Sequence, residues 1–504
     1  MLQEYCTYFP LPLFSYKNRR SFFQLFLIAL LSLSVISVNK AGQLSNILSF
    51  HTVDRASANA LAIPPLMTSF DRAIYLPLVN LGASVYYVAA NGDDSNPGTL
   101  AKPWRSIQKA ANNAIPGEIV YLRGGTYSEF IEVYKSGTQK QPIQFKAYPG
   151  ENPVIDGNNQ LPPYQQALFS IFGDWVSLSG IEIRNSSNDG LGLYGNNDKA
   201  DNIYSHHNRY MGIMITGDYC TVENSRAWRN SLVNEYGVLQ SNWSTGISSA
   251  NRNTIAEHNV IRNNVVWENW GEGISVHEST LTVVENNISH DNYSTNFYIS
   301  DATNILFQSN FAYMDPSSYV YGYGYGHNVG IMMGDEKYNP SSENITIVNN
   351  IAIGNTVNFW WWQGVQGGGM KNVLIANNTF VNSMNTSGII IHTGTHQNVR
   401  MMNNVIQQDD DLLIIDLDDA TGITFSNNLW SKAPTDQAFG YGDIIGDPAL
   451  AHDGDKFSVE WFGLTELSPA IDVAISLPET VVDYLDVRRE PPPDIGAIEF
   501  IAHP

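Results

Sequence analysis

The sequence of 504 residues is poor in positive charge, with 27 Lys and Arg against 49 Asp and Glu and a formal net charge of −22. Because binding to phosphate groups needs clustered cations, this composition argues against a nucleic-acid partner. It also argues against direct contact with an acidic polymer, unless a divalent cation bridges the two negative surfaces. Nothing in the sequence indicates a protein partner, and we expect a monomer.

Cysteine and long hydrophobic runs are scarce too. Cys6 and Cys220 are too far apart to indicate a disulfide framework or a zinc site. The apolar run over residues 22–38 follows three cations and is shorter than a comfortable bilayer span. We therefore interpret residues 1–40 as an export signal, with an uncleaved membrane anchor as the alternative, and residues 41–83 as a linker. This predicts an extracellular or cell-surface protein.

Asparagine is the abundant residue, and none occurs after Asn428. Short apolar alternations are separated by Asn-Asn pairs; the first two pairs are 23 residues apart, and later ones follow at intervals of 28, 26 and 24 residues. The pairs are Asn263-Asn264, Asn286-Asn287, Asn349-Asn350, Asn377-Asn378, Asn403-Asn404 and Asn427-Asn428. A period of this length indicates an internal structural repeat.

Each repeat is too short for a βαβ unit, and it contains strand-like runs rather than a helical period. Alternation directs Ile274 and Val276 inward and Ser275 and His277 outward. Such strands wind into coils that stack in parallel, so we predict an all-β, right-handed parallel β-helix. Asn tolerates the left-handed backbone of tight turns, and one predicted column of hydrogen-bonded amides contains Asn208, Asn230, Asn269, Asn292 and Asn355.

Both ends of such a solenoid need a cover, because open sheet edges invite aggregation. Residues 104–114 have apolar residues at helical spacing behind Pro103, which predicts a short N-terminal capping helix. We divide the chain into an N-terminal opening segment with this cap (84–160), the repeats (161–430) and an irregular C-terminal cap (431–504).

Residues 86–157 carry a family resemblance. The matching strings are Tyr86 to Thr99, Pro103-Trp104, Ile107 to Ala110, Pro116 to Glu118, Arg123 to Tyr127, Tyr148 to Gly150 and Asp156-Gly157. They resemble the opening segment of secreted β-helix proteins in the pectate-lyase-like superfamily, including uncharacterised proteins and family 9 polysaccharide lyases. The resemblance implies binding and cleavage of an extracellular polysaccharide.

Family 9 lyases are known for a lysine base beside an aspartate cluster that holds calcium. In this sequence the corresponding Asp189-Gly190 coil has Tyr194 at the outward position, and Lys199 lies beyond the strand. We therefore assign the base to no lysine. Arg226, Arg229, Arg252 and Arg262 are the alternative bases for a lyase.

In this superfamily the substrate usually lies along the outer face of one parallel sheet. Aromatic side chains recur at the outward positions here, and flat rings suit the apolar faces of sugars. The predicted substrate-binding residues are Tyr194, Trp270, Tyr298, Trp360, Trp362 and His392. The alternative is that the tyrosine-rich insertion 308–330 folds over these rings and buries them.

Acidic residues align as well, with Glu278, Asp301 and Asp335 after the strand on three successive coils. Carboxylates one or two coils apart lie roughly 5 to 10 Å apart, which spans the separations found in glycosidases. The same three residues could instead bind Ca²⁺ through hard oxygen ligands, or form a solvated edge. Glu272 precedes the strand between two glycines, and His277 could shuttle a proton. The candidate catalytic residues are Glu272, His277, Glu278 and Asp301.

A second column contains His207, Arg229, Glu268 and Asp291, which we interpret as a salt-bridged structural ladder. The sequence leaves the reaction open between elimination and hydrolysis. The alternative from another class is a non-catalytic rod on the cell surface that binds glycans or acts as an adhesin.

Overall fold

The structure, a computed structural model, describes residues 84–240, 243–250, 255–323, 328–337, 342–385 and 387–502. The chain divides into two units, Met1–Pro77 and Leu78–Pro504, and every described residue belongs to the second. The predicted export signal, the predicted linker and Arg252 lie outside the described residues. The domain boundaries proposed above stay predictions.

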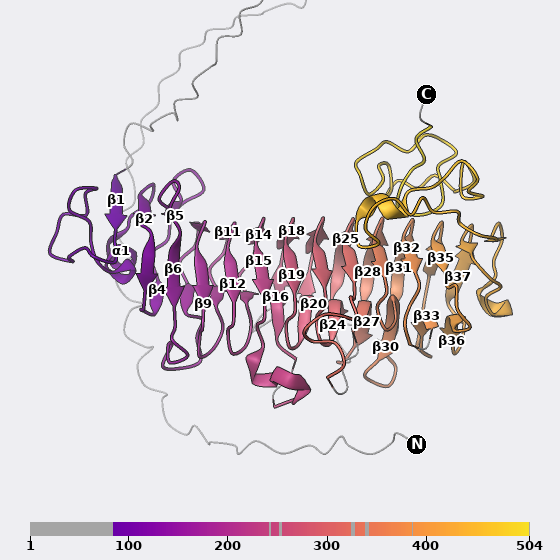
Figure 1. Ribbon diagram of the computed structural model, residues 1–504, viewed down its shortest axis with the longest axis horizontal. Coiled ribbons are helices and arrows are strands. Elements are labelled where there is room, and N and C mark those ends of the chain that lie inside the picture. Colours follow the sequence, from indigo (N-terminus) through magenta and orange to yellow (C-terminus); the bar gives the residue numbers. More distant parts are fainter. Residues whose placement is uncertain are drawn as a thin grey trace, which may run out of the picture. The chain divides into compact units, whose positions relative to one another are not determined.

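The described chain forms three parallel sheets, and each coil of the solenoid contributes a strand to each sheet in turn (Figure 1). Sheet 1 contains β1 (Val85–Val88), β2 (Ile119–Leu122), β5 (Ile143–Ala147), β8 (Val176–Ser179), β11 (Lys199–Asp201), β14 (Thr221–Glu223), β17 (Ala256–Glu257), β18 (Val260–Arg262), β21 (Ser279–Thr280), β22 (Val283–Glu285), β25 (Thr303–Gln308), β28 (Glu343–Val348), β31 (Lys371–Ala376), β34 (Val399–Met402) and β37 (Ile423–Ser426). Sheet 2 contains β4 (Ile131–Val133), β7 (Phe169–Ile171), β10 (Leu191–Leu193), β13 (Ile213–Ile215), β16 (Thr245–Ala250), β20 (Glu272–His277), β24 (Thr295–Ser300), β27 (Val329–Asp335), β30 (Phe359–Gln363), β33 (Ser387–Ile391) and β36 (Leu413–Leu417). Sheet 3 contains β3 (Gly125–Tyr127), β6 (Pro153–Asp156), β9 (Glu182–Arg184), β12 (Tyr204–His206), β15 (Arg226–Trp228), β19 (Val265–Trp267), β23 (Ile288–His290), β26 (Phe311–Tyr313), β29 (Ile351–Ile353), β32 (Thr379–Val381), β35 (Val405–Gln407), β38 (Leu429–Trp430) and β39 (Ile444–Ile445).

The core fills the space between the sheets with aliphatic and aromatic side chains. Ile274 pairs with Phe297 and Val276 with Ile299 in adjacent parallel strands, and all four are at most 1% exposed. The predicted inward register is therefore confirmed. Because successive coils lie about 4.8 Å apart, each outward side chain has its neighbours directly above and below.

The predicted asparagine column is confirmed, with one additional member. Asn230 donates from Nδ2 to Oδ1 of Asn269 over 3.0 Å, and Asn269 donates in the same way to Asn292 over 2.8 Å. Asn296 then connects Asn292 to Asn355, with distances of 2.9 and 2.8 Å. Asn296 thus continues the column of amides across the longer coil.

The predicted charged column forms only in part. Arg229 and Glu268 make an ion pair of 2.7 Å, but Asp291 contacts His290 at 2.6 Å, and His207 contacts His206 at 2.7 Å. Each member of the column has a positive φ, between 50° and 55°. The column is therefore a series of left-handed turns. Within it, Asp291 pairs with His290 and His207 pairs with His206.

The ends of the solenoid are covered as predicted, by a helix at one end and irregular chain at the other. The helix α1 (Ile107–Asn113) buries Ile107 and Ala110 and is capped by Ser106, whose Oγ accepts from the Lys109 backbone N–H. At the other end, Ala438 of η2 (Asp436–Ala438) joins the main core.

Later residues, including η3 (Val459–Phe462), pack on the outer face of sheet 3, where Phe462 contacts Phe311. The remaining helical segment, η1 (Leu232–Gly237), projects beside β16 and β20 (Figure 1). Among the helices of the described chain, none has the length and apolar character needed to cross a membrane.

Candidate functional site

The outer face of sheet 2 carries a row of side chains in register. Met214 pairs with Ser248, Ser248 with Ser275, and Ser275 with Tyr298. The outward positions deduced from the sequence follow this register, except that β16 was not recognised as a coil. The insertion around η1 lengthens that coil, which hides its place in the repeat.

A cavity of about 440 Å³ opens on this face, within the size range of small-ligand sites. Its lining comes from four neighbouring strands, from the segment after η1 and from the segment after β27. The lining residues are Met211, Met214, Leu239, Trp243, Thr245, Ser248, Ala250, Glu272, Ser275, His277, Tyr298 and Glu336. Three of the predicted site residues, Glu272, His277 and Tyr298, thus meet in one cavity, although their roles stay predictions.

Glu272 is the buried carboxyl of this cavity, with only 7% of its surface exposed. Burial, together with the negative charge of Glu336, raises the pKa of Glu272 to about 8, although a hydrogen bond from Ser275 acts to lower it. The side chain therefore carries a proton at neutral pH. A carboxyl that is protonated near neutrality can act as a general acid.

Glu336 is the second carboxyl of the cavity, and the sequence analysis missed it. The hydroxyl of Tyr298 donates to Oε1 of Glu336 over 2.6 Å, and burial keeps the pKa of Tyr298 well above its usual range. Glu336 is exposed and follows the end of β27, where the alternation of inward and outward residues no longer predicts which way a side chain points. An acidic residue beside Asp335 in an Asp-Glu pair was the only available signal.

The three carboxylates predicted to bind calcium have another function in the structure, because they fix the segment that carries Glu336. Asp301 accepts hydrogen bonds from the backbone N–H groups of Glu336 and Lys337, at 3.1 and 2.9 Å. Glu278 forms an ion pair with the Lys337 ammonium group. Asp335 accepts from the Ser342 and Gly369 backbones at 2.8 and 2.7 Å.

The calcium prediction from this stack stays a prediction. Asp301 and Asp335 are fully buried, and N–H and O–H donors occupy their oxygens. Within the described ranges, no group of three or more His, Cys, Asp or Glu side chains is arranged to hold a metal ion. Burial raises the pKa of Asp301, while the hydrogen bonds from the Lys337 backbone and the Ser300 hydroxyl lower it.

The other predicted binding aromatics do not line the cavity. Trp270 is fully buried and packs against Tyr293, Tyr319 and Tyr323, so the predicted alternative of a tyrosine-rich cover is correct for this residue. Its prediction as a sugar-stacking residue is wrong, because no face of the ring reaches the surface.

The remaining predicted aromatics lie on other coils of sheet 2. Tyr194 packs on Phe172, at a ring distance of 5.0 Å, toward the N-terminal end. Trp360 meets His392 edge to face at 5.6 Å toward the C-terminal end, and Trp362 lies against Gly334. All four are half-buried.

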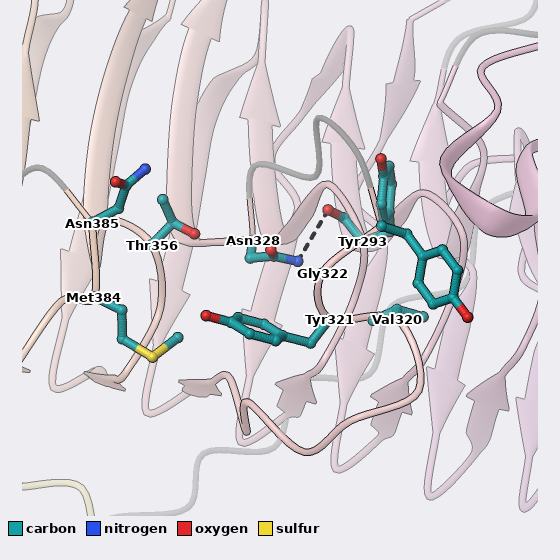
Figure 2. A pocket seen from close by; sticks show the side chains of 9 residues that line it. Tyr293, Val320, Tyr321, Gly322, Asn328, Thr356, Met384 and Asn385 are labelled. Atoms are coloured by element: carbon teal, nitrogen blue, oxygen red, sulfur yellow. Dashed lines mark hydrogen bonds between the residues drawn. The ribbon is translucent and has the colours of Figure 1, made fainter.

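A second cavity, of about 270 Å³, is lined in part by Tyr293 and Val320, which also belong to the cluster around Trp270. Tyr321, Met384 and Asn385 line it, and Asn328 donates to the backbone oxygen of Tyr293 over 3.1 Å (Figure 2). Its lining, within the part of the chain that the structure describes, offers rings and amides and contains no carboxyl group or imidazole. Such groups can contact a sugar.

The arginines considered as lyase bases lie away from the cavity. Arg226 belongs to sheet 3, where it contacts the Tyr204 ring, and Arg229 follows the same strand and pairs with Glu268. Arg262 belongs to sheet 1 and pairs with Glu223 at 2.7 Å. Among the residues that line the larger cavity in the described structure, none is Lys or Arg.

Comparison with known proteins places this geometry in context. Residues 86–398 match the family described as "Pel9A-like, right handed beta helix region". Pectate lyase L of Dickeya chrysanthemi is 25% identical over 343 residues, which cover 62% of this chain and 75% of that protein. Pectate lyase L of Paenibacillus polymyxa (strain SC2) is 28% identical over 211 residues, and the match spans 46% of its length.

Solved structures show the same fold. The crystal structure of pectate lyase Pel9A superposes with a TM-score of 0.56 at 21% identity, covering 83% of this chain and 98% of that one. The complex of XylC with xylose superposes with a TM-score of 0.59 at 12% identity, over 83% of this chain and 98% of the other. The predicted right-handed parallel β-helix and the predicted resemblance are thereby confirmed.

Proposed function

The chain belongs to the Pel9A-like right-handed β-helix family, and from this premise we propose that it cleaves a polysaccharide in the cavity on sheet 2. The pectate lyases of this family supply the substrate class. The cavity supplies the place, because it combines two carboxyl groups, an imidazole and a phenol on adjoining coils.

The burial of the Glu272 carboxyl in the wall of the cavity is the observation that carries this proposal. Cleavage of a glycosidic linkage leaves a sugar oxygen that needs a proton, and Glu272 is a buried carboxyl that holds one at neutral pH. Hydrophobic neighbours such as Met214 and Trp243 give the cavity an apolar wall for a sugar ring. Glu272 is then the proton donor, and His277 contacts the substrate from the same strand.

The export signal expected from residues 1–40 makes an extracellular polysaccharide the natural substrate. The high negative charge of the chain suits a soluble secreted protein, and it keeps other anionic surfaces at a distance. In this proposal the protein works outside the cell on a polymer that reaches the open cavity from solvent.

A glycan screen with two matched variants tests the proposal. Glu272→Gln keeps the shape of the side chain but loses the acidic proton, so turnover should fall about 100-fold or more. Asp416→Asn is the control, because Asp416 is an exposed acid on the same sheet in register with Ile390. Its turnover should equal that of the parent protein. Release of reducing ends measures cleavage, and circular dichroism checks the fold.

The same screen addresses the non-catalytic alternative. If a glycan binds without being cleaved by the parent protein, the proposed activity is wrong and the protein is a glycan-binding rod. If Glu272→Gln cleaves as fast as Asp416→Asn, the cavity is not the active site.

A further inference from the structure

We propose that the sheet 2 cavity hydrolyses a linkage between uncharged sugars, with Glu272 as general acid and Glu336 as the carboxylate that receives a proton from water. This inference rests on the proposed function, and it names the reaction and the substrate class. It separates this chain from the elimination chemistry of the pectate lyases to which it is related.

The charge of the cavity is the first argument. Elimination from a uronate needs a cation or a positively charged side chain at the substrate carboxylate, and it needs a base at the neighbouring carbon. The described lining contains two carboxyl groups and no Lys or Arg. Lys337, the residue after Glu336, is held by Glu278.

A uronate would therefore enter a negative site. Like charges repel more strongly at a protein surface than in bulk water, because the effective dielectric constant there is lower. Asp301 and Asp335 already accept hydrogen bonds from backbone N–H groups of the chain. An uncharged sugar avoids the repulsion altogether.

The carboxyl pair is the second argument, because its two members have different environments. Glu272 is buried and keeps its proton, while Glu336 is exposed and accepts a hydrogen bond from Tyr298. Two carboxyl groups in different environments within one cavity are the arrangement that glycoside hydrolysis uses. The negative charge of Glu336 itself helps Glu272 to hold its proton.

The reaction balances with water as the only co-reactant. The bond between the anomeric carbon and the bridging oxygen breaks as the proton of Glu272 moves to that oxygen. Water forms the new bond to the anomeric carbon and gives a proton to Glu336. Exchange of one proton through solvent then restores both side chains. The net reaction consumes one glycosidic linkage and one water molecule, and it produces two new chain ends.

The polar groups of the cavity suit hydroxyls rather than carboxylates. Ser248 and Ser275 lie on adjoining strands with their Oγ atoms 3.0 Å apart, where each can exchange this hydrogen bond for one to a sugar hydroxyl. Trp243 offers an apolar surface beside them. Neutral donors and acceptors next to an aromatic ring are typical of sites for uncharged sugars.

Two substrate panels test the inference, one of neutral polysaccharides such as xylan, arabinan and galactan, and one of uronate polymers such as polygalacturonate and alginate. We expect reducing ends from a neutral polymer, no ultraviolet absorbance from an unsaturated product, and one ¹⁸O atom at the new anomeric carbon in H₂¹⁸O. Unsaturated products from a uronate polymer would overturn the inference and leave the proposed function intact. No cleavage in either panel would overturn both.

Variants assign the two roles. Glu272→Gln should lower turnover of the polymer about 100-fold. It should keep nearly the parent's activity on a dinitrophenyl glycoside of the same sugar, because that leaving group needs no proton. Glu336→Gln should lose activity on both substrates, and Asp416→Asn on neither. Equal losses of Glu272→Gln on the two substrates would contradict the acid role. Parent activity of Glu336→Gln on both would contradict the carboxylate role. The retained aryl-glycoside activity shows that Glu272→Gln is folded, and circular dichroism checks the fold of Glu336→Gln.

Discussion

The hydroxyl of Tyr298 and Oε1 of Glu336 lie 2.6 Å apart, although 38 residues separate them in the chain. Tyr298 belongs to β24, in the middle of sheet 2, and Glu336 follows β27 on the next coil. A rigid strand residue thus holds an exposed carboxylate over the cavity. The position of Glu336 depends on this bond and on the backbone contacts of Asp301.

The Tyr298 hydroxyl should contribute to catalysis through Glu336. Hydrogen bonds to charged groups contribute about 1.5 to 3 kcal/mol, so Tyr298→Phe should lower kcat/KM by roughly 10- to 100-fold. Tyr321→Phe is the control, because Tyr321 is 39% exposed and lines the other cavity. Steady-state kinetics on the substrate found in the screen measure both. Equal activity of the two variants would show that Glu336 does not need the hydroxyl.

Asp301 should act as a positioning residue for Glu336. In Asp301→Asn, one amide NH₂ faces the backbone N–H groups of Glu336 and Lys337 that the carboxylate accepts. We expect kcat to fall about 10-fold with little change in KM, because the substitution removes roughly one hydrogen bond to a charged group. The double variant with Glu336→Gln should be no slower than Glu336→Gln alone.

The same variant tests the calcium hypothesis. If Asp301 holds an ion, added Ca²⁺ should raise Tm in the parent protein and less in Asp301→Asn. The hydrogen bonds of Asp301 predict equal Tm responses in both proteins. A smaller response in the variant would support the calcium stack.

Much of the fold could be predicted from the sequence because the solenoid repeats one local rule. Alternation places Val276 and Ile299 inside wherever a coil returns, and the Asn column marks the same turn each time. The rule failed at β16, where the insertion around η1 breaks the period. It also failed for Trp270, because the segment that buries this ring comes from a distant insertion.

The candidate site could be predicted only where it follows the repeat. Glu272, His277 and Tyr298 occupy regular positions of β20 and β24. Glu336 lies in an irregular segment, and its direction is set by contacts that no period encodes. Alignment of Glu278, Asp301 and Asp335 was correct, but alignment does not say whether a carboxylate faces an ion or a backbone N–H.

The buried asparagine column should be a major source of stability. Asn269→Ala removes hydrogen bonds to both neighbouring coils: the backbone N–H of Asn230 loses its acceptor, and the oxygen of Ala227 and Oδ1 of Asn292 each lose a donor. Each such group costs about 1 to 3 kcal/mol, so unfolding should become easier by roughly 3 kcal/mol or more. Asn385→Ala, at an exposed Asn, should change stability by less than about 0.5 kcal/mol. Denaturant unfolding of the two variants measures the difference, and similar midpoints would contradict the prediction.

Trp360 should contribute to binding of long chains rather than to the chemical step. It lies two coils from Tyr298 on the outer face of sheet 2, through Met332, and outside the cavity. A ring at that distance contacts only sugars beyond the cleaved linkage, in the ground state and the transition state alike. Trp360→Ala should raise KM for long oligomers several-fold and leave kcat unchanged. A lower kcat with an unchanged KM would place Trp360 in the chemical step instead.

The proton on Glu272 should make both stability and activity depend on pH. Burial raises the pKa of Glu272 from 4.5 to about 8, so the folded protein keeps this proton at pH values where the unfolded chain has released it. The free energy of unfolding therefore falls as pH rises from about 4.5 to 8, by on the order of 5 kcal/mol in total. Glu272→Gln has no proton to lose, so its Tm should match the parent near pH 4.5 and exceed it increasingly up to pH 8.

Activity should depend on the same proton, and it should fall as Glu272 loses that proton. Catalysis needs protonated Glu272, so kcat of the parent should be constant below the pKa of about 8 and fall tenfold per pH unit above it. Tm scans and pH–rate profiles of the parent, Glu272→Gln and Asp416→Asn give both measurements. If the Tm curves of the parent and Glu272→Gln stay parallel from pH 5 to 8, Glu272 is ionised in the folded protein, and it cannot be the acid that protonates the leaving oxygen.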